Sequence, residues 1–167
     1  ALFMRSLGQL TYKAAIAHLV VPETPVALRA RKYYVLFPGA GWSGRRWPVD
    51  RFACLAEKLF DRTGWSGVIC GGPDEREIAE QLVRASGAPL ESWIGKTSVS
   101  EMAAIFAAAD IVVTNETSGV HLAAALATPS VCILGGGHFG RFVPYHLDEP
   151  IAHGALPLPV YETMPCF

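Results

Sequence analysis

The chain has 167 residues, 51% of them hydrophobic, which suits one globular domain with a sizeable core. Its net charge of −1 excludes the general attraction to nucleic acid or to an anionic membrane that a strongly basic protein has. No apolar run approaches the ~20 residues that a membrane-spanning helix needs, so we expect no transmembrane segment.

The cysteines indicate the redox compartment of the protein, and the basic residues indicate whether it can bind an anion. The four cysteines are widely spaced and form no C-x-x-C pair, which argues against a zinc site. Three lie in apolar runs, so we expect buried thiols in a reducing, cytoplasmic protein: Cys54, Cys70 and Cys132. The stretch from Arg29 to Arg51 is basic, and its only acid is Asp50. Its basic side chains either face solvent, which the charge pattern alone favours, or attract a small anionic ligand. Its basic residues are Arg29, Arg31, Lys32, Arg45, Arg46 and Arg51.

Short apolar runs alternate with amphipathic segments from residue 33 onward. The apolar runs predict buried strands at 33–37, 67–70, 111–114 and 130–134, and a weaker strand at 91–94. Helical spacing predicts helices from Pro48 to Gly64 and at 74–85, 98–109 and 120–127. We expect the first two helices to bury Phe52, Leu55, Leu59 and Phe60, and Ile78, Leu82 and Val83. Ser98 and Glu101 have the spacing of a capping box at the start of the third helix.

This alternation predicts an α/β fold, a Rossmann-like parallel sheet with helices on both faces. Residues 1–32 are expected to be a linker and residual interdomain segment, because prolines interrupt a weak helical pattern there. Ligands of such sheets bind outside the carboxyl ends of the strands. The site is therefore expected in the loops that follow the strands, at 38–47, 71–75, 95–98, 115–119 and 135–141.

The loop 115–119, which follows the predicted strand 111–114, is the strongest candidate site. Small residues such as Gly119 let the backbone approach a ligand, and the start of the next helix attracts an anion. Thr117 and Ser118 can bond a phosphate oxygen, or they can simply cap the helix. Glu116 would repel a diphosphate, so in a nucleotide-sugar site it should face sugar hydroxyls. His121, in the first turn, is more often structural than catalytic.

Two further loops carry polar residues at strand ends. Arg45 and Arg46 lie near Gly41 and can bind a phosphate with paired hydrogen bonds, or they can flank a buried Trp47 as solvated side chains. Position at a strand end favours the phosphate role for Arg45. Glu75 can accept hydrogen bonds from ribose hydroxyls or complement the dipole of its own helix, and the sequence favours neither.

A glycine run at 135–140 matches G-x-G-x-x-G and keeps a second class of function open, an NAD(P)-dependent oxidoreductase. That motif requires a helix directly after the glycines and an acid about 20 residues further on, and neither is seen. We interpret the run as a ligand-facing loop in which His138 and Arg141 can touch the ligand.

The motifs occur together in an order that resembles a known family. They are Gly39-x-Gly41 with Arg45-Arg46-Trp47-Pro48, Gly71-Gly72-Pro73-x-Glu75, Gly95-Lys96-Thr97-Ser98, and the run from Asn115 to Ala125. Over roughly residues 33–145 the chain resembles the C-terminal domain of glycosyltransferase family 9, the ADP-heptose:lipopolysaccharide heptosyltransferase family.

The resemblance implies a GT-B architecture, in which two Rossmann-like domains face a cleft and the C-terminal one, here 33–145, holds the nucleotide-sugar donor. It implies an ADP-heptose-like donor. We expect no cofactor, and no metal, because the chain has no Asp-x-Asp pair that could hold Mg²⁺ against the phosphates. The acceptor, a lipopolysaccharide or another saccharide, and the general base are expected in an N-terminal domain that this chain lacks. Residues 146–167 are expected to be a truncated C-terminal extension. The setting is cytoplasmic, which leaves open a peripheral attachment of the full-length protein to the inner membrane.

The resemblance also implies roles for single residues. Arg45 takes the place of a basic residue, often lysine, at the donor diphosphate and sugar. Glu75 matches an acid that bonds the ribose, and Thr97 matches a position in the base pocket. Glu116 stands where the family usually has aspartate, and Ser118 where glycine is common, so the identity of the sugar stays open. The predicted donor-binding set is Gly41, Arg45, Arg46, Glu75, Thr97, Glu116, Thr117, Ser118, Gly119 and His121, with no metal and no catalytic residue assigned.

Overall fold

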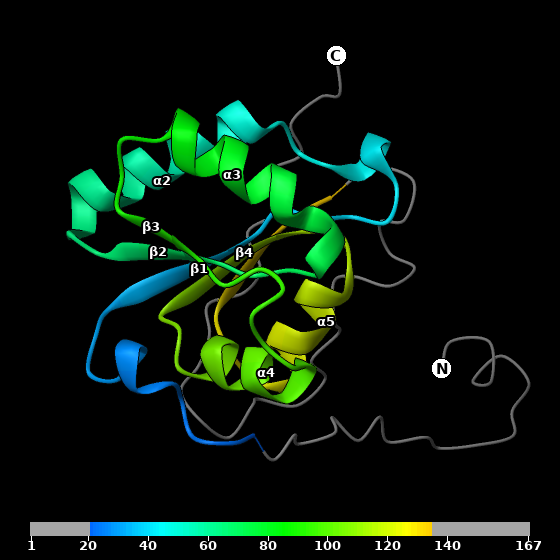
Figure 1. The fold of residues 1–167 in the computed structure, drawn as a ribbon. Coiled ribbons are helices and arrows are strands. Elements are labelled where there is room, and N and C mark those ends of the chain that lie inside the picture. The colour runs from blue at the N-terminus through cyan, green and yellow to red at the C-terminus, as the bar shows by residue number, and fades with distance from the viewer. Residues whose placement is uncertain (1–20, 135–167) are drawn as a thin grey trace, which may run out of the picture.

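The computed structural model describes residues 21–134, which form a five-stranded sheet with helices on both faces (Figure 1). The strands lie in the order β3-β2-β1-β4-β5, and all neighbouring pairs are parallel. They are β1 (Tyr33–Phe37), β2 (Ser66–Ile69), β3 (Leu90–Ser92), β4 (Ile111–Asn115) and β5 (Ser130–Ile133). The predicted α/β class and Rossmann-like parallel sheet are confirmed.

Four helices cover the sheet, two on each side. α2 (Val49–Thr63) and α3 (Arg76–Ala85) lie above the sheet in Figure 1, and α4 (Val99–Ala107) and α5 (Ser118–Ala125) lie below it. Three short 3-10 turns complete the described part: η1 (Val26–Leu28), η2 (Ser43–Arg45) and η3 (Pro73–Glu75). None of the helices between residues 21 and 134 is long and apolar enough to cross a membrane.

The central strand β1 divides its side chains between two hydrophobic layers. Tyr33, Val35 and Phe37 pack in the layer of α4 and α5, whereas Tyr34 and Leu36 pack in the layer of α2 and α3. This alternation follows from the two-residue repeat of a strand, and it explains why the run is apolar throughout. The two tyrosine hydroxyls donate to helix carbonyls, Tyr33 to Ile105 at 2.7 Å and Tyr34 to Ala56 at 3.1 Å.

The helix faces differ in detail from the predicted ones. Phe60 and Val83 are exposed, at 38% and 41%, and the fully buried positions of α2 and α3 are instead mainly alanines beside Phe52 and Leu82. Small side chains at these positions let the helices approach the sheet closely. Of the three predicted buried thiols, only Cys70 is fully buried, because Cys54 on α2 is exposed and Cys132 on β5 is half-buried. The strand β5 was also predicted to be buried, but Ser130 and Val131 are exposed.

Element boundaries were predicted to within a few residues. The start of α3 differs by two residues, because the turn at Pro73–Glu75 is a 3-10 helix and the α-helix begins only at Arg76. Helix α5 begins at Ser118 rather than 120. The predicted capping box at Ser98 and Glu101 is present, with the Ser98 N–H donating to Glu101 Oε2 at 2.8 Å.

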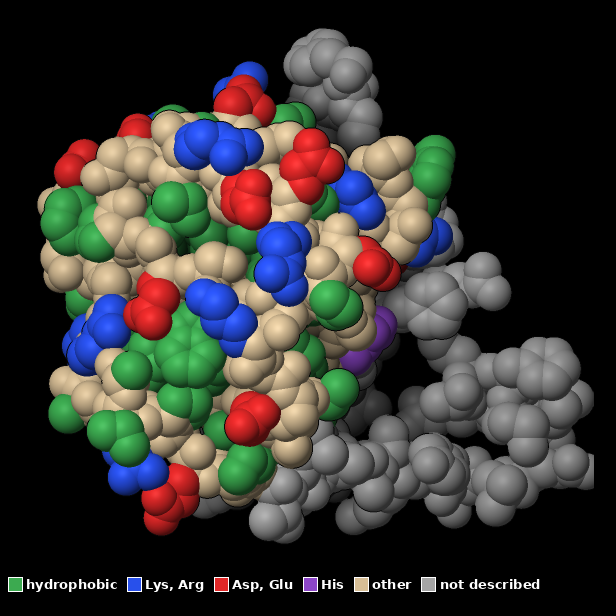
Figure 2. Space-filling model, viewed as in Figure 1, with side chains coloured by type: hydrophobic (Ala, Val, Ile, Leu, Met, Phe, Trp, Pro, Cys, Tyr) green, Lys and Arg blue, Asp and Glu red, His purple; other side chains and the backbone are tan. Residues whose placement is uncertain are grey.

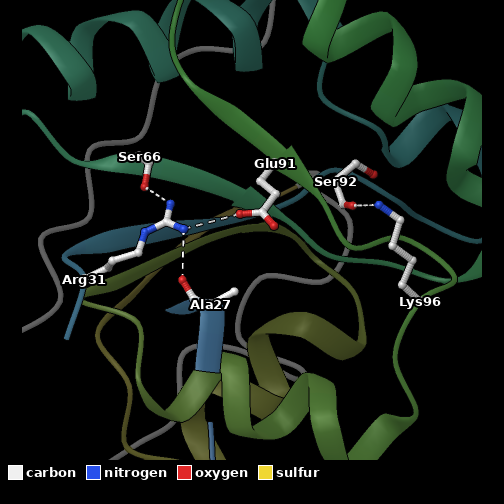
Figure 3. A network of polar contacts seen from close by, with 6 residues as sticks. All are labelled: Ala27, Arg31, Ser66, Glu91, Ser92 and Lys96. Atoms are coloured by element: carbon white, nitrogen blue, oxygen red, sulfur yellow. Dashed lines mark hydrogen bonds and ion pairs between the residues drawn. The ribbon is translucent and has the colours of Figure 1, made fainter. Parts of the chain in front are cut away.

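The basic stretch is divided between the two ends of the sheet. At the amino end, Arg31 donates to the Ala27 carbonyl at 3.1 Å and to Ser66 Oγ at 2.7 Å, and it lies 3.5 Å from the Glu91 carboxylate (Figure 3). Lys32 pairs with Asp110 at 2.5 Å. These two side chains therefore anchor the entry into β1. Acidic and basic side chains are interspersed over the face that Figure 2 shows, so no single-sign field covers it.

Stability should fall at alkaline pH because buried groups resist ionisation. Burial raises the pKa of Cys70 from 9.0 to about 12 and that of Tyr34 from 10.0 to about 12, and it also raises the pKa of Tyr33. The unfolded chain releases these protons first. We therefore expect the free energy of unfolding to fall between about pH 9 and pH 12, by up to about 1.4 kcal/mol per pH unit for each group.

Urea unfolding at a series of pH values measures this effect. Tyr34→Phe removes one titrating group and should make the decline shallower. A free energy of unfolding that stays constant from pH 8 to pH 11 would contradict the prediction.

Candidate functional site

A cleft of about 330 Å³ opens at the carboxyl ends of β1, β2 and β4. The chain order reverses direction across the sheet between β1 and β4, and open parallel sheets bind their ligands at such a switch point. The cleft is lined by Phe37, Gly39, Ala40, Gly41, Arg46, Gly72, Asp74, Glu75, Thr117 and Ser118. Five of the ten predicted donor-binding residues are thus brought together: Gly41, Arg46, Glu75, Thr117 and Ser118.

The start of helix α5 forms one wall of the cleft. Thr117 is its N-cap residue, but its side chain makes no capping hydrogen bond to the helix. Helix α4, in contrast, is closed by the Ser98 and Glu101 side chains. The amide groups in the first turn of α5 are therefore not covered by a side-chain cap, and the positive end of the helix dipole lies at the cleft.

Gly119 allows this helix to lie close to the sheet. A Cβ atom at this position would lie 2.5 Å from Thr114 Oγ1 and 2.8 Å from the Phe37 ring. Both neighbours are buried and belong to the strands on either side of the switch point. Gly119 therefore brings the start of α5 down onto β1 and β4, and it does so by packing rather than by lining the cleft.

The loop 38–47 forms the opposite wall, and the side chain of Asn115 holds it. Asn115 Nδ2 donates to the Pro38 carbonyl at 2.7 Å, and Oδ1 accepts a hydrogen bond from the Trp47 N–H at 3.0 Å. Sequence reasoning singled out this segment without assigning the Asn115 side chain a role. The available signal was a polar residue at the end of an otherwise apolar strand.

The two arginines of the loop have different positions. The Arg46 guanidinium donates twice to the Ala40 carbonyl, from Nε at 3.0 Å and from Nη2 at 2.8 Å, and it lines the cleft. Arg45 ends η2, is exposed, and does not line the cleft. Arg46 thus both closes the loop on itself and places positive charge at the cleft wall.

Glu75 lies on the third side of the cleft, against two glycines. Its Oε2 accepts a hydrogen bond from the Gly72 N–H at 2.8 Å, within the η3 turn. A Cβ atom at Gly39 or at Gly71 would overlap the Glu75 carboxylate, so the two glycines leave room for this position of the side chain. The structure therefore shows the local role of this acid, while the ribose contact stays a prediction.

The remaining predicted residues, Thr97, Glu116 and His121, do not line the cleft. Thr97 is half-buried in the turn after β3, and His121 is exposed on α5. Glu116 is buried, with 7% exposed, and its N–H donates to the Ile133 carbonyl at 3.1 Å. Burial, and secondly the Glu116 charge, raise the pKa of Cys132 to about 12.

Two predictions concern features that the described residues do not decide. Between residues 21 and 134, no three His, Cys, Asp or Glu side chains lie close enough to hold a metal ion, and the metal-independence prediction is not tested by this. The glycine run at 135–140, with His138 and Arg141, lies outside the described residues.

Comparison with known proteins decides the family. The profile of glycosyltransferase family 9 (heptosyltransferase) matches residues 7–155. The chain belongs to this family.

Named relatives agree with the family 9 assignment. The chain is 31% identical over 103 residues to lipopolysaccharide heptosyltransferase 2 of Escherichia coli K12, which covers 59% of this chain and 29% of that protein. It is 35% identical over 104 residues to lipopolysaccharide heptosyltransferase 1 of Pseudomonas aeruginosa, covering 62% and 28%. The matched part is therefore less than a third of either relative.

Solved structures of family 9 share the fold. E. coli ADP-heptose lps heptosyltransferase II superposes with a TM-score of 0.59 and 29% identity, over 61% of this chain and 32% of that one. E. coli heptosyltransferase WaaC with ADP superposes with a TM-score of 0.58 and 27% identity, over 81% and 43%. A family 9 protein from Veillonella parvula has a TM-score of 0.67 at 22% identity, over 78% and 41%, and shows the fold alone.

Gly119→Ala should destabilise the domain, because the added methyl group meets Thr114 and Phe37 in a packed layer. We expect a loss of about 1–3 kcal/mol in the free energy of unfolding, the usual range for overpacking. Gly72→Ala is the matched control, since a Cβ atom there has nothing within 4 Å and its φ of −74° suits alanine. Equal unfolding free energies for the two variants would show that the α5 contact tolerates the methyl group.

Proposed function

We propose that residues 33–145 are the donor-binding domain of a family 9 glycosyltransferase and bind a nucleoside-diphosphate sugar, such as an ADP-heptose, in the cleft at the switch point. The observation that carries this proposal is the pairing of two walls across one cleft. One wall is the start of α5 without a side-chain cap, and the other is the loop that presents Arg46. Amide groups, a helix dipole and a guanidinium together suit a diphosphate.

The order of the strands supports the orientation of such a donor. From the edge of the sheet inward, the polar candidates at the carboxyl ends are Thr97 after β3, Glu75 after β2, Arg46 after β1 and Glu116 after β4. A nucleotide sugar has its base, ribose, diphosphate and sugar in this same linear order. We therefore place the base near Thr97 and the transferred sugar near Glu116.

Transfer to an acceptor needs more than the donor wall. We propose that the acceptor, a lipopolysaccharide or another saccharide, and the general base belong to an N-terminal domain of the whole protein. Glycosyl transfer requires a base beside the acceptor hydroxyl and a site closed against water. The solved relative WaaC, with ADP and with ADP-2-deoxy-2-fluoro heptose, supports the donor class. Positive charge from arginine and α5 makes a bound metal unnecessary in this proposal.

The oxidoreductase alternative depends on the glycine run at 135–140. The described cleft is formed without that run, by the loops after β1, β2 and β4. Membership of family 9 also favours the transferase. A direct comparison of ligands separates the two functions.

Calorimetric titration of the purified chain should show binding of ADP and of ADP-heptose, with no comparable binding of NAD. In an amide chemical-shift experiment, ADP should perturb the loop 38–47 and residues 115–121, because the diphosphate lies between them. Shifts confined to other loops, or binding of NAD alone, would reject the donor site in this cleft.

Arg45 does not line the cleft, but it lies on the cleft-wall loop and the family resemblance gives it the diphosphate contact. On that proposal, Arg45→Ala should weaken ADP binding by about 1.5–3 kcal/mol, the range for a hydrogen bond to a charged group, and should leave adenosine binding nearly unchanged. Arg46→Ala should weaken ADP binding and also lower stability, since it removes two bonds to the Ala40 carbonyl. Arg51→Ala is the control, because Arg51 is an exposed arginine on α2, outside the loop 38–47 that forms the cleft wall. Equal losses for ADP and adenosine in Arg45→Ala would assign that residue a structural role.

A further inference from the structure

Asn115 connects the two segments that form the walls of the cleft. Its backbone ends β4 and leads directly into Glu116 and Thr117, and so into the α5 wall. Its side chain, which has no exposed surface, reaches across to the loop 38–47 that follows β1. One residue therefore connects the two segments between which we place the diphosphate.

The side chain holds both ends of the loop. Nδ2 donates to the Pro38 carbonyl at 2.7 Å, where the loop leaves β1, and lies 3.5 Å from the Gly39 carbonyl. Oδ1 accepts from the Trp47 N–H at 3.0 Å, where the loop returns toward α2. The Trp47 ring then packs edge-to-face on Phe52, with centroids 5.1 Å apart. The residues from 41 to 46 are exposed, so the loop is held at these two ends and by the bonds of Arg46 to the Ala40 carbonyl.

The chemistry of these anchors is specific to an amide. A carbonyl at one end requires a donor, and an N–H at the other requires an acceptor, and an amide supplies both without a charge. Leucine has a similar size but supplies neither. A carboxylate supplies only the acceptor, and it would leave a buried charge facing the Pro38 carbonyl.

We propose that Asn115 is a positioning residue that sets the separation between the loop 38–47 and the start of α5, and thereby the affinity for the diphosphate. This inference rests on the donor-binding function proposed above. Asn115 does not touch the donor; it acts through the cleft walls. A nucleoside without phosphates does not span these walls, so its binding is independent of Asn115.

If Asn115 had a purely structural role, its substitution would affect ADP binding no more than the substitution of another buried side chain that makes a hydrogen bond. Thr128 is a matched case, since it is also buried and its Oγ1 donates to the Phe106 carbonyl at 3.0 Å. Thr128 precedes β5 and lies away from the cleft lining. Thr128→Val removes one buried hydrogen bond without touching either wall.

The test compares wild type, Asn115→Leu, Asn115→Asp and Thr128→Val in the same chain. Titrations measure the dissociation constants of ADP and adenosine, and amide hydrogen exchange reports the loop 38–47 without ligand. We expect Asn115→Leu to raise the ADP dissociation constant by about tenfold or more, the equivalent of the two lost hydrogen bonds, with little change for adenosine. Exchange of the loop amides should accelerate. Thr128→Val should leave both dissociation constants and the loop exchange near wild type.

Asn115→Asp adds a readout that a folding defect would not give. Once the new side chain is ionised, the carboxylate cannot donate to Pro38, so on the alkaline side of its titration ADP should bind as weakly as to Asn115→Leu. As the pH falls, protonation restores a donor at that position, and ADP affinity relative to wild type at the same pH should recover. The pH dependence of ADP binding by Asn115→Asp tests the inference even if Asn115→Leu does not fold.

Three results would overturn the inference: an ADP effect no larger than that of Thr128→Val, an equal loss for adenosine, or an Asn115→Asp affinity that does not recover relative to wild type at low pH. Failure of wild type to bind ADP would refute the proposed donor function instead. In that case the hydrogen exchange still tests the connection between the walls, and unchanged loop exchange in both Asn115 variants would refute it as well.

Discussion

Burial of β1 on both faces is the constraint on which the rest of the structure depends. This strand has neighbours on either side, β2 and β4, and a helical layer above and below. Its five residues are all buried, and it pairs with a parallel strand on each side. A parallel strand of this kind can only sit inside a sheet that both helical layers cover. The layers, in turn, require the crossover connections that bring all carboxyl ends to one edge.

The cleft follows from the reversal of strand order beside this strand. Loops after β1 and β2 and the turn after β4 diverge from one edge, which leaves space that no side chain of the core fills. The backbone of these loops cannot join the sheet, so side chains satisfy it. Asn115, Arg46 and Glu75 each bond loop backbone, and two of these three also line the cleft. The groups that hold the loops and the groups that can meet a ligand are thus partly the same.

Two helix starts on the same face of the sheet illustrate how function departs from local stability. Helix α4 has reciprocal side-chain caps from Ser98 and Glu101, and these bonds lower the pKa of Glu101. Helix α5 has a capping-competent residue, Thr117, that makes no such bond. A capped α5 would be locally more stable, but the cap would occupy the amides that an anion needs. This unmet local preference agrees with the proposed donor site, since local preferences are not all met at sites that bind ligands.

The sequence by itself determined the class of fold, the order of the elements and the edge of the sheet at which the cleft opens. Hydrophobic periodicity carries that information because burial on two faces, on one face or on none leaves different residue patterns. The motif order also indicated the family that the profile match establishes. What only the tertiary structure decided are contacts between segments distant in the chain. That Phe60 and Val83 face solvent depends on how closely the alanines of α2 and α3 approach the sheet. That Arg46 rather than Arg45 lines the cleft depends on a loop closed at Ala40, and that loop is held by Asn115, 68 residues along the chain from Trp47. Such contacts follow from packing geometry, which the spacing of residues along the chain does not encode.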